Sequence, residues 1–111
     1  MKESTIIRTV LDRVKTLRRL GHPVKAVKLH GSRYVEAGTP DLHITAAGRS
    51  IWLEAKRPGK KPTPLQRLRL REWGAAGAVT GVVESVDEAM EIIMGVLREA
   101  ADAAGGMKDG Q

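Results

Sequence analysis

The chain has 111 residues, a formal net charge of +6 and no cysteine, and only 3% of its residues are aromatic. This length predicts one domain, whose core must be built from Ile, Leu, Val and Ala. The absence of cysteine excludes a disulfide scaffold, a thiolate zinc site and a cysteine nucleophile. The positive charge favours a polyanionic partner, most commonly nucleic acid, although a basic protein without such a partner would have the same composition.

The sequence gives no sign of a membrane protein or an exported one. No apolar run approaches the ~18 residues that a membrane span needs. The first four residues, Met-Lys-Glu-Ser, lack the apolar segment of a signal peptide. We therefore expect a soluble protein of the cytoplasm, with no membrane partner.

The first half of the chain predicts one helix and three strands. The helix covers residues 4–20, where apolar residues recur at helical spacing and basic residues lie mainly off that stripe. Residues 30–40, with two glycines and a proline, predict a loop, and Ala47-Gly48-Arg49 predicts the tight turn of a hairpin. The apolar stripe consists of Ile6, Ile7, Val10, Leu11, Val14 and Leu17. The strands are expected at 24–29, 41–46 and 50–56.

The second half predicts a helix, a buried strand at 78–83 and a last helix. Thr63 before Pro64 is a helix start, with a hydroxyl N-cap and a proline at the first helical position, and that helix should end near Ala76. Ser85 and Glu88 form a capping box that opens the last helix. Its apolar stripe consists of Ala89, Ile92, Ile93, Val96 and Leu97.

The predicted order is α-β-β-β-α-β-α, which describes an α/β domain with a mixed sheet: a hairpin, then a strand reached through a helical crossover. The last residues are small and Gly-rich. We expect the domain to span 1–102 and residues 103–111 to form a frayed, flexible tail.

The predicted third strand contains the residues that suggest chemistry. Side chains alternate along a strand, so Trp52, Glu54 and Lys56 share one face. Asp41 begins the preceding strand, and two carboxylates close together suit Mg²⁺ or Mn²⁺. Such an ion stabilises charge on a phosphodiester and helps to ionise water, and Lys56 would orient or deprotonate that water or neutralise the phosphate. The alternative is a structural ion pair between Glu54 and Lys56.

Two further polar residues have alternatives that the sequence leaves open. Glu3 lies at the leading edge of the inward stripe of the first helix, either as a partner of the helix dipole, which the residues alone favour, or as a third metal ligand. Gln66 lies in the first turn of its helix, as an ordinary polar residue or as a hydrogen-bond donor to a phosphate or a metal-bound water. His22, His30 and His43 lack metal-ligand spacing.

Basic residues crowd the segment beside this candidate site. A run of this kind is often a solvated surface, but here it adjoins the two carboxylates and resembles a phosphate-binding surface. The absence of interleaved aromatic residues argues against a single-strand stacking platform and for duplex or branched DNA. No P-loop is present, so nucleotide hydrolysis is not indicated. The basic residues are Lys56, Arg57, Lys60, Lys61, Arg67, Arg69 and Arg71.

Taken together, six short segments resemble the VRR-NUC domain, a branch of the PD-(D/E)xK nuclease superfamily, over roughly residues 3–97. The combination is specific, whereas any one segment is not. These segments are Glu3, Gly38-Thr39-Pro40-Asp41, Trp52-Leu53-Glu54-Ala55-Lys56, Pro62-Thr63-Pro64-Leu65-Gln66, Trp73 and Ala76-Gly77-Ala78.

The resemblance implies a restriction-endonuclease-like α/β core that binds Mg²⁺ or Mn²⁺. The ligands would be Glu3, Asp41, Glu54 and the carbonyl of Ala55. Lys56 matches the catalytic lysine of the motif, and Gln66 matches a glutamine that supports the site. DNA contacts are then expected from Arg57, Lys60, Lys61 and Arg67.

Stand-alone domains of this size are similar to phage-encoded nucleases, which would act in the host cytoplasm. They also resemble Holliday-junction resolvases in fold and in forming homodimers, whose two active sites suit a two-fold junction. A structure-selective endonuclease acting on four-way junctions is therefore the first expectation. A less selective replication or repair nuclease and a catalytically silent DNA-binding module are the alternatives.

Overall fold

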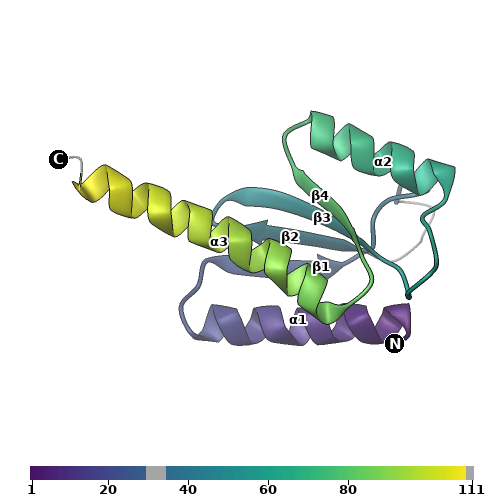
Figure 1. The fold of residues 1–111 in the computed structure, drawn as a ribbon, viewed down its shortest axis with the longest axis horizontal. Helices are drawn as coiled ribbons and strands as arrows, with labels where there is room; N and C mark the ends of the chain where they lie inside the picture. The colour runs from purple at the N-terminus through teal and green to yellow at the C-terminus, as the bar shows by residue number, and fades with distance from the viewer. Residues whose placement is uncertain (30–34, 110–111) are drawn as a thin grey trace.

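The computed structural model describes residues 1–29 and 35–109, with the backbone alone for 106–109. Helices and strands follow one another in the predicted order α-β-β-β-α-β-α (Figure 1). None of the helices within these ranges is long and apolar enough to cross a membrane. The elements are α1 (Glu3–Arg19), β1 (Val24–Lys28), β2 (Leu42–Ala46), β3 (Arg49–Ala55), α2 (Pro64–Ala75), β4 (Val79–Val83) and α3 (Val86–Asp109).

The four strands form one mixed sheet in the spatial order β1-β2-β3-β4. β1, β2 and β3 are antiparallel neighbours, and β4 returns parallel to β3 after the α2 crossover. Ala47 and Gly48, with φ of 50° and 79°, form the two-residue turn between β2 and β3. Positive φ at both positions matches the turn type whose twist suits a hairpin. The register pairs Leu42 with Leu53, which aligns the start of β2 with the end of β3.

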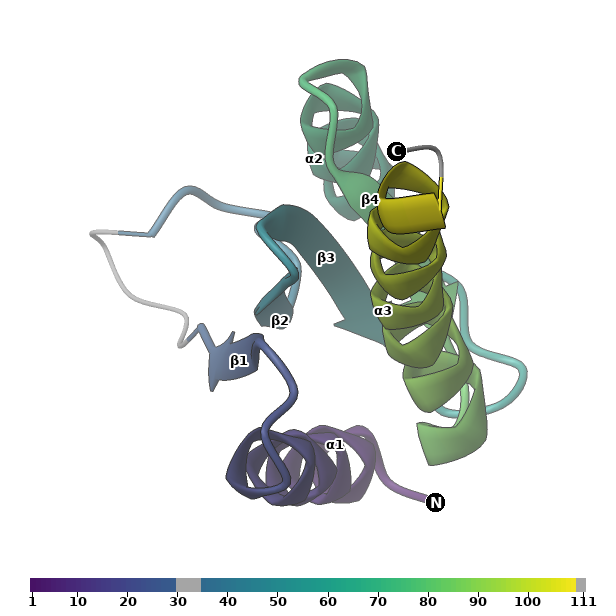
Figure 2. The ribbon, with the colours of Figure 1, turned by 90° about the vertical axis from the view of Figure 1, so that its left-hand side faces the viewer.

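One face of the sheet carries the core, because α1 and α3 both pack on it (Figure 2). The predicted helical stripes supply this layer: Ile6, Val10 and Val14 from α1 and Ala89 and Ile93 from α3 are all buried. The sheet contributes the alternate set of β3 together with residues of β2. These strand residues are Ile51, Leu53, Ala55, Leu42 and Ile44.

The opposite face is covered by α2 over β3 and β4. Trp52 projects from β3 on this face and is stacked between His43 of β2 and Trp73 of α2, with ring centroids 4.3 and 4.1 Å apart. The His43 side chain also makes a 3.2 Å hydrogen bond with Ser50. Trp52, His43 and Glu54 therefore share the second face, as strand alternation predicts.

The predicted boundaries hold to within one or two residues except at the end of the chain. α3 continues to Asp109, so its backbone is helical through most of the segment expected to fray. The domain limits 1–102 and 103–111 remain predictions.

Ser85 accepts a hydrogen bond from Glu88 N at 3.1 Å, as a capping box requires, but Glu88 Oε2 accepts from Glu84 N at 2.7 Å and not from Ser85 N.

Gly38 brings the segment before β2 into close contact with α2. Its φ is 81°, and a Cβ built there would lie 2.8 Å from Leu65 Cγ and 3.1 Å from the Leu65 carbonyl carbon. Two residues later Pro40 is fully buried. The tight approach at Gly38 therefore fixes the position of Asp41, the residue directly before β2.

We expect Gly38→Ala to destabilise the fold more than Gly48→Ala does. Both positions have positive φ, which costs an L-residue about 1–2 kcal/mol. Only Gly38 also meets Leu65, and overpacking adds about 1–3 kcal/mol. Urea unfolding of the two variants measures the difference, and equal losses of stability would show that the Leu65 contact is not tight.

Candidate active site

Glu54 lies near the end of β3 on the face shared with Trp52, and only 2% of its surface is exposed. One carboxyl oxygen, Oε1, is 3.4 Å from the side-chain nitrogen of Gln66. The other, Oε2, is buried without a hydrogen-bond partner among the described residues. A buried, half-satisfied carboxyl costs free energy unless a proton or a cation compensates it.

Asp41 precedes β2 and is tied to both neighbouring strands. Its Oδ2 accepts a hydrogen bond from Ala55 N at 3.0 Å, and its main-chain oxygen accepts from Leu29 N at 2.9 Å. The antiparallel register of β2 and β3 therefore places the Asp41 carboxylate next to the residue that follows Glu54. The two carboxylates that sequence reasoning selected lie together at this end of the sheet.

The electrostatics of Glu54 reflect this arrangement. Burial, the neighbouring Asp41 carboxyl group and, to a smaller extent, Glu3 together raise the pKa of Glu54 from 4.5 to about 8, with burial the largest cause. Lys56 acts in the opposite direction and lowers that pKa. At neutral pH without a cation, Glu54 therefore holds a proton, which removes the repulsion between the two carboxyl groups.

Gln66 connects this site to the start of α2. Its Oε1 accepts from Thr63 N at 2.9 Å while Thr63 Oγ1 accepts from Gln66 N at 3.1 Å, which completes a capping box. With the oxygen so used, the amide nitrogen points to Glu54. One side chain thus caps the helix and lies against the buried carboxyl, and a supporting role of Gln66 in the site stays a prediction.

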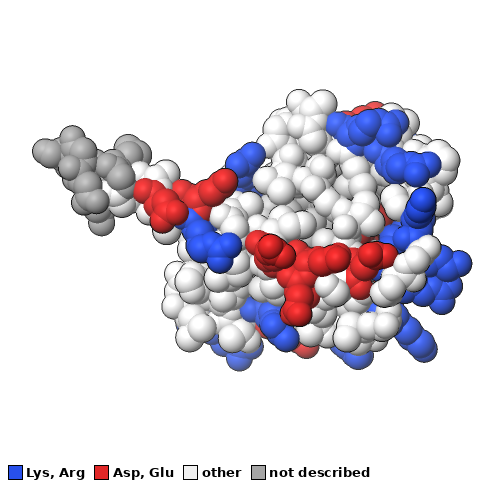
Figure 3. Space-filling model, viewed as in Figure 1, with Lys and Arg blue, Asp and Glu red and all other residues white. Residues whose placement is uncertain are grey.

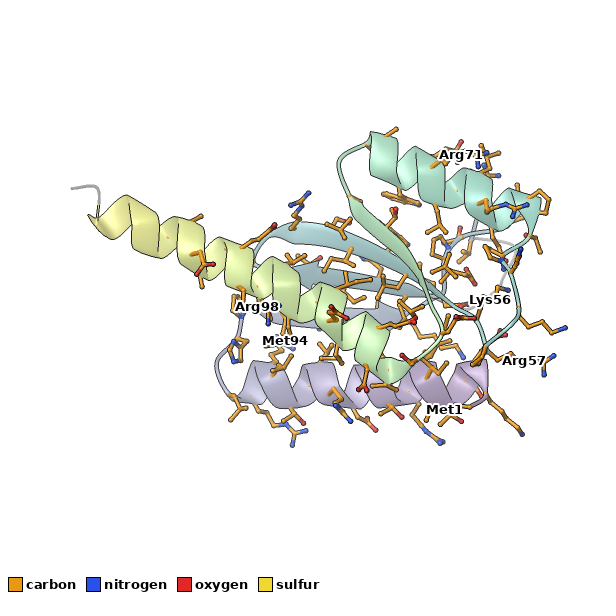
Figure 4. The ribbon with its side chains drawn as sticks, viewed as in Figure 1. Met1, Lys56, Arg57, Arg71, Met94 and Arg98 are labelled. Atoms are coloured by element: carbon orange, nitrogen blue, oxygen red, sulfur yellow. The ribbon has the colours of Figure 1, made fainter. Side chains whose placement is uncertain are left out.

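Lys56 follows β3 and is half-buried, with its N–H donating to Val83 O at 2.9 Å. Glu54 and Lys56 form no ion pair within 4.0 Å among the described residues, so the structural pair considered as an alternative does not occur. Figure 4 shows Lys56 and Arg57 at the same end of the molecule as Met1 and the start of α1.

The predicted DNA-binding residues occupy exposed positions near this end. Arg57, Lys60 and Lys61 lie in the loop between β3 and α2, and Arg67 lies on α2. Figure 3 shows basic atoms along this margin of the molecule. Arg69 differs from this group, because only 18% of its side chain is exposed and its guanidinium contacts Glu36 and Glu72 at 3.1 and 3.0 Å.

Arg69 holds the loop that leads to Asp41, a role that sequence reasoning did not find. Besides Glu36, its Nε contacts the carbonyl oxygen of Ala37 at 2.9 Å. Arg69 therefore fixes α2 against the segment that contains Gly38. Nothing in the local sequence around Arg69 distinguishes it from the exposed basic residues beside it.

Glu3 is the first residue of α1, and its Oε2 accepts a hydrogen bond from Arg57 N at 3.2 Å. It therefore lies beside the segment after Lys56 and close enough to raise the pKa of Glu54. A role as partner of the helix dipole is compatible with its place in the first turn. Coordination of a metal by Glu3 stays a prediction.

The donor set at this site fits a hard divalent cation in part. Asp41 and Glu54 offer carboxylate oxygens, and Glu54 Oε2 is a buried acceptor without a donor in the described structure. No group of three His, Cys, Asp or Glu side chains within residues 1–29 and 35–109 is arranged to hold an ion. The geometry thus supports a site with two carboxylates, and ligation by Glu3 or by the Ala55 carbonyl remains predicted.

Of the three histidines, His30 lies outside the described residues. His43 is on the face of Glu54 but uses its ring against Trp52, and burial lowers the pKa of His43. It is therefore a strand residue of the second face. The sequence did not reveal that His43, Trp52 and Trp73 form one stack, because they come from three different elements.

The fold has known counterparts, although no protein-family model and no curated protein matches this sequence. A solved structure described as "VRR_NUC domain protein" aligns with a TM-score of 0.70 and 22% identity over 85% of this chain and 86% of that one. A second, described as "VRR_NUC domain", aligns with a TM-score of 0.66 and 24% identity over 83% of this chain and 94% of that one.

At these identities the likeness establishes a shared fold. The restriction-endonuclease-like α/β fold that the sequence resemblance implied is therefore confirmed. The similarity covers nearly the whole length of each counterpart.

Stability should depend on pH through Glu54. Without divalent cations, the folded protein retains up to about pH 8 a proton that the unfolded chain releases above 4.5, so rising pH favours unfolding across this window. Glu54→Gln removes this proton linkage. The free energy of unfolding of Glu54→Gln, relative to that of the wild type, should therefore increase from pH 4.5 to about pH 8 and then level off.

Urea unfolding of both proteins in EDTA at several pH values measures this difference. A gain that is the same at pH 5 and pH 8 would show that the Glu54 carboxyl titrates near its ordinary pKa in the folded protein.

Proposed function

We propose that this protein is a DNA endonuclease of the VRR-NUC type that depends on Mg²⁺ or Mn²⁺. The observation that carries this proposal is the buried Glu54 carboxyl, which lies beside Asp41 with one oxygen unpartnered in the described structure. A fold shared with VRR_NUC domains supports it, as does the positive charge of the chain. A two-carboxylate cation site beside a basic surface suits the hydrolysis of a DNA phosphodiester.

Each residue of the site has a proposed task. Asp41 and Glu54 would hold the cation, with Glu3 and the Ala55 carbonyl as further ligands, and the ion would stabilise charge on the phosphorus and favour ionised water. Lys56 would orient or deprotonate the attacking water, or neutralise the phosphate. Gln66 positions Glu54 through its amide. Arg57, Lys60, Lys61 and Arg67 would contact the DNA backbone.

The substrate form that we propose is branched DNA, in particular a four-way junction cut by a homodimer. A domain of this size has little surface with which to distinguish a junction from plain duplex. Two copies related by a two-fold axis would match the symmetry of a junction and present two basic loops to separate arms. A protein of this kind encoded by a phage would act in the cytoplasm of the host.

α3 provides a surface that suits self-association. Its C-terminal part extends past the sheet (Figure 1), and Ala101, Ala103 and Ala104 are exposed there. Helical turns without tertiary contacts are marginally stable in water. A second copy packed on this extension would stabilise it.

A nuclease with little preference for branches would use the same catalytic residues, and a silent DNA-binding module would lack activity. The burial of Glu54 beside Asp41 counts against the silent module, because strongly shifted carboxyl pairs of this kind are concentrated at functional sites. Cleavage of junction, flap and linear duplex in parallel distinguishes these possibilities.

Asp41→Asn should reduce cleavage by at least about 10²-fold, because it removes a charge that the cation requires. Lys56→Ala should also lose activity but should still bind Mn²⁺, since Lys56 acts on water or phosphate. Cleavage assays and titration calorimetry with Mn²⁺ test the pair, and Arg98→Ala serves as a control on α3. Full activity of Asp41→Asn would contradict the metal assignment, and loss of Mn²⁺ binding by Lys56→Ala would contradict the role of Lys56.

The wild-type protein should be a dimer that cuts a synthetic four-way junction faster than linear duplex, with binding that weakens steeply as salt increases. Ala104→Arg should weaken the dimer and the preference for junctions, while cleavage of linear duplex continues. Solution mass and product mapping measure both properties. A monomeric wild type, or equal cleavage of the two substrates, would leave the less selective nuclease as the function.

A further inference from the structure

The loop after Lys56, residues 57–62, is held by two carboxylates from distant parts of the chain. Glu3 Oε2 accepts from Arg57 N at 3.2 Å, and Glu84 Oε2 accepts from Gly59 N at 3.0 Å. Within the loop, Lys60 N donates to Arg57 O at 3.1 Å. The side chains of Arg57, Lys60 and Lys61 are exposed, so the loop backbone is fixed while its basic side chains face solvent.

Glu84 is itself held in place by the start of α3. Its N–H donates to Glu88 Oε2 at 2.7 Å, and Glu88 N donates to Ser85 Oγ at 3.1 Å. The preceding residue, Val83, accepts from Lys56 N at 2.9 Å. The end of β4 therefore fixes both Lys56 and, three residues later, Gly59.

The charge of Glu84 does not suit a direct contact with DNA. Glu84, Glu88 and Glu91 line a pocket of about 460 Å³ together with Lys60 and Lys61. Glu84 forms no ion pair with these lysines in the described structure. It contacts the loop through the hydrogen bond that it accepts from Gly59 N. A carboxylate at this place repels DNA phosphate. Glu84 can therefore favour DNA binding only by holding the loop 57–62 in position.

We propose that Glu84 is a positioning residue that holds the loop 57–62 so that Arg57, Lys60 and Lys61 meet the DNA backbone together. This rests on the proposed nuclease function and extends it to a residue remote in sequence from the motif. Ordering the loop before DNA arrives reduces the entropy lost on binding. Glu84 thus acts on DNA affinity through the loop backbone, and its negative charge opposes that effect.

Replacing Glu84 separates the hydrogen bond from the charge. Glu84→Gln keeps an oxygen acceptor without the charge, Glu84→Ala removes both, and Glu84→Asp keeps the charge on a side chain one methylene shorter. Binding of the full chain to a four-way junction and to linear duplex is measured in EDTA, which prevents metal-dependent cleavage. We expect Glu84→Ala and Glu84→Asp to bind about tenfold more weakly than the wild type, which corresponds to about 1.4 kcal/mol.

Glu84→Gln should bind as tightly as the wild type or more tightly. The dependence of affinity on salt should become shallower in Glu84→Ala and Glu84→Asp, because fewer phosphate contacts form. If Glu84 only stabilised the fold, Glu84→Ala would lower the thermal stability and leave the salt dependence of DNA binding unchanged.

Glu91→Ala is the matched control. Glu91 lines the same pocket but has no hydrogen bond to the loop among the described contacts. Its removal eliminates the same charge and should leave binding unchanged or stronger. If Glu84→Ala strengthens binding as Glu91→Ala does, Glu84 acts through charge alone and the proposal is wrong.

Hydrogen exchange at the Gly59 amide tests the contact independently of DNA. Exchange should be slow in the wild type and in Glu84→Gln, and faster in Glu84→Ala. Unprotected Gly59 in the wild type would overturn the positioning role even if the protein cuts DNA. Conversely, a protected Gly59 in a protein that neither binds nor cuts DNA would contradict the nuclease proposal and leave the loop contact established.

Discussion

The arrangement of this domain depends on the burial of one carboxyl group, that of Glu54, at the end of β3. Two effects acting together, burial and the proximity of Asp41, raise its pKa to about 8. The surrounding structure serves to hold this unfavourable arrangement: the β2–β3 register brings Asp41 to Ala55 N, and Gln66 reaches Glu54 from α2. Groups held at such a cost to stability are concentrated at functional sites.

α2 provides much of this support although it packs weakly, with Leu70 its one buried residue. Three contacts place it: the Gln66 amide at Glu54, the approach of Leu65 to Gly38, and the bonds of Arg69 to the loop before Asp41. The Trp52–Trp73 stack attaches its other end to the sheet. The crossover helix thus acts as a support that aligns the segments of Asp41 and Glu54.

The sequence was sufficient to predict the elements, their order and the proximity of Asp41 and Glu54. Periodicity identified the stripes of α1 and α3 because both helices bury one face against the same side of the sheet, and local cap and turn residues marked the boundaries. Alternation along β3 placed Glu54 opposite the core because its neighbours Leu53 and Ala55 are apolar. The length of α3 was not predicted, since small residues and glycine give a weak local signal for a helix.

The contacts that could not be predicted join residues far apart in the chain. Glu84 reaches Gly59, Glu3 reaches Arg57, and Arg69 reaches Ala37 only after β4, α1 and α2 have packed on the sheet. Each of these residues looks like an ordinary surface charge in the sequence. Basic residues were therefore grouped together even though Arg69 is largely buried and engaged, whereas Arg57 and Lys60 are exposed.

The most direct test of this account is the pKa of the Glu54 carboxyl, measured by carbon-detected NMR titration with and without Mg²⁺. Without the ion, the carboxyl should titrate near 8, because burial and Asp41 favour its protonated form. With Mg²⁺, the titration should move to lower pH, since the cation stabilises the ionised form. A carboxyl that titrates near 4.5 without the ion, or whose titration is unchanged by it, would contradict the assignment of Glu54 and Asp41 as a cation site.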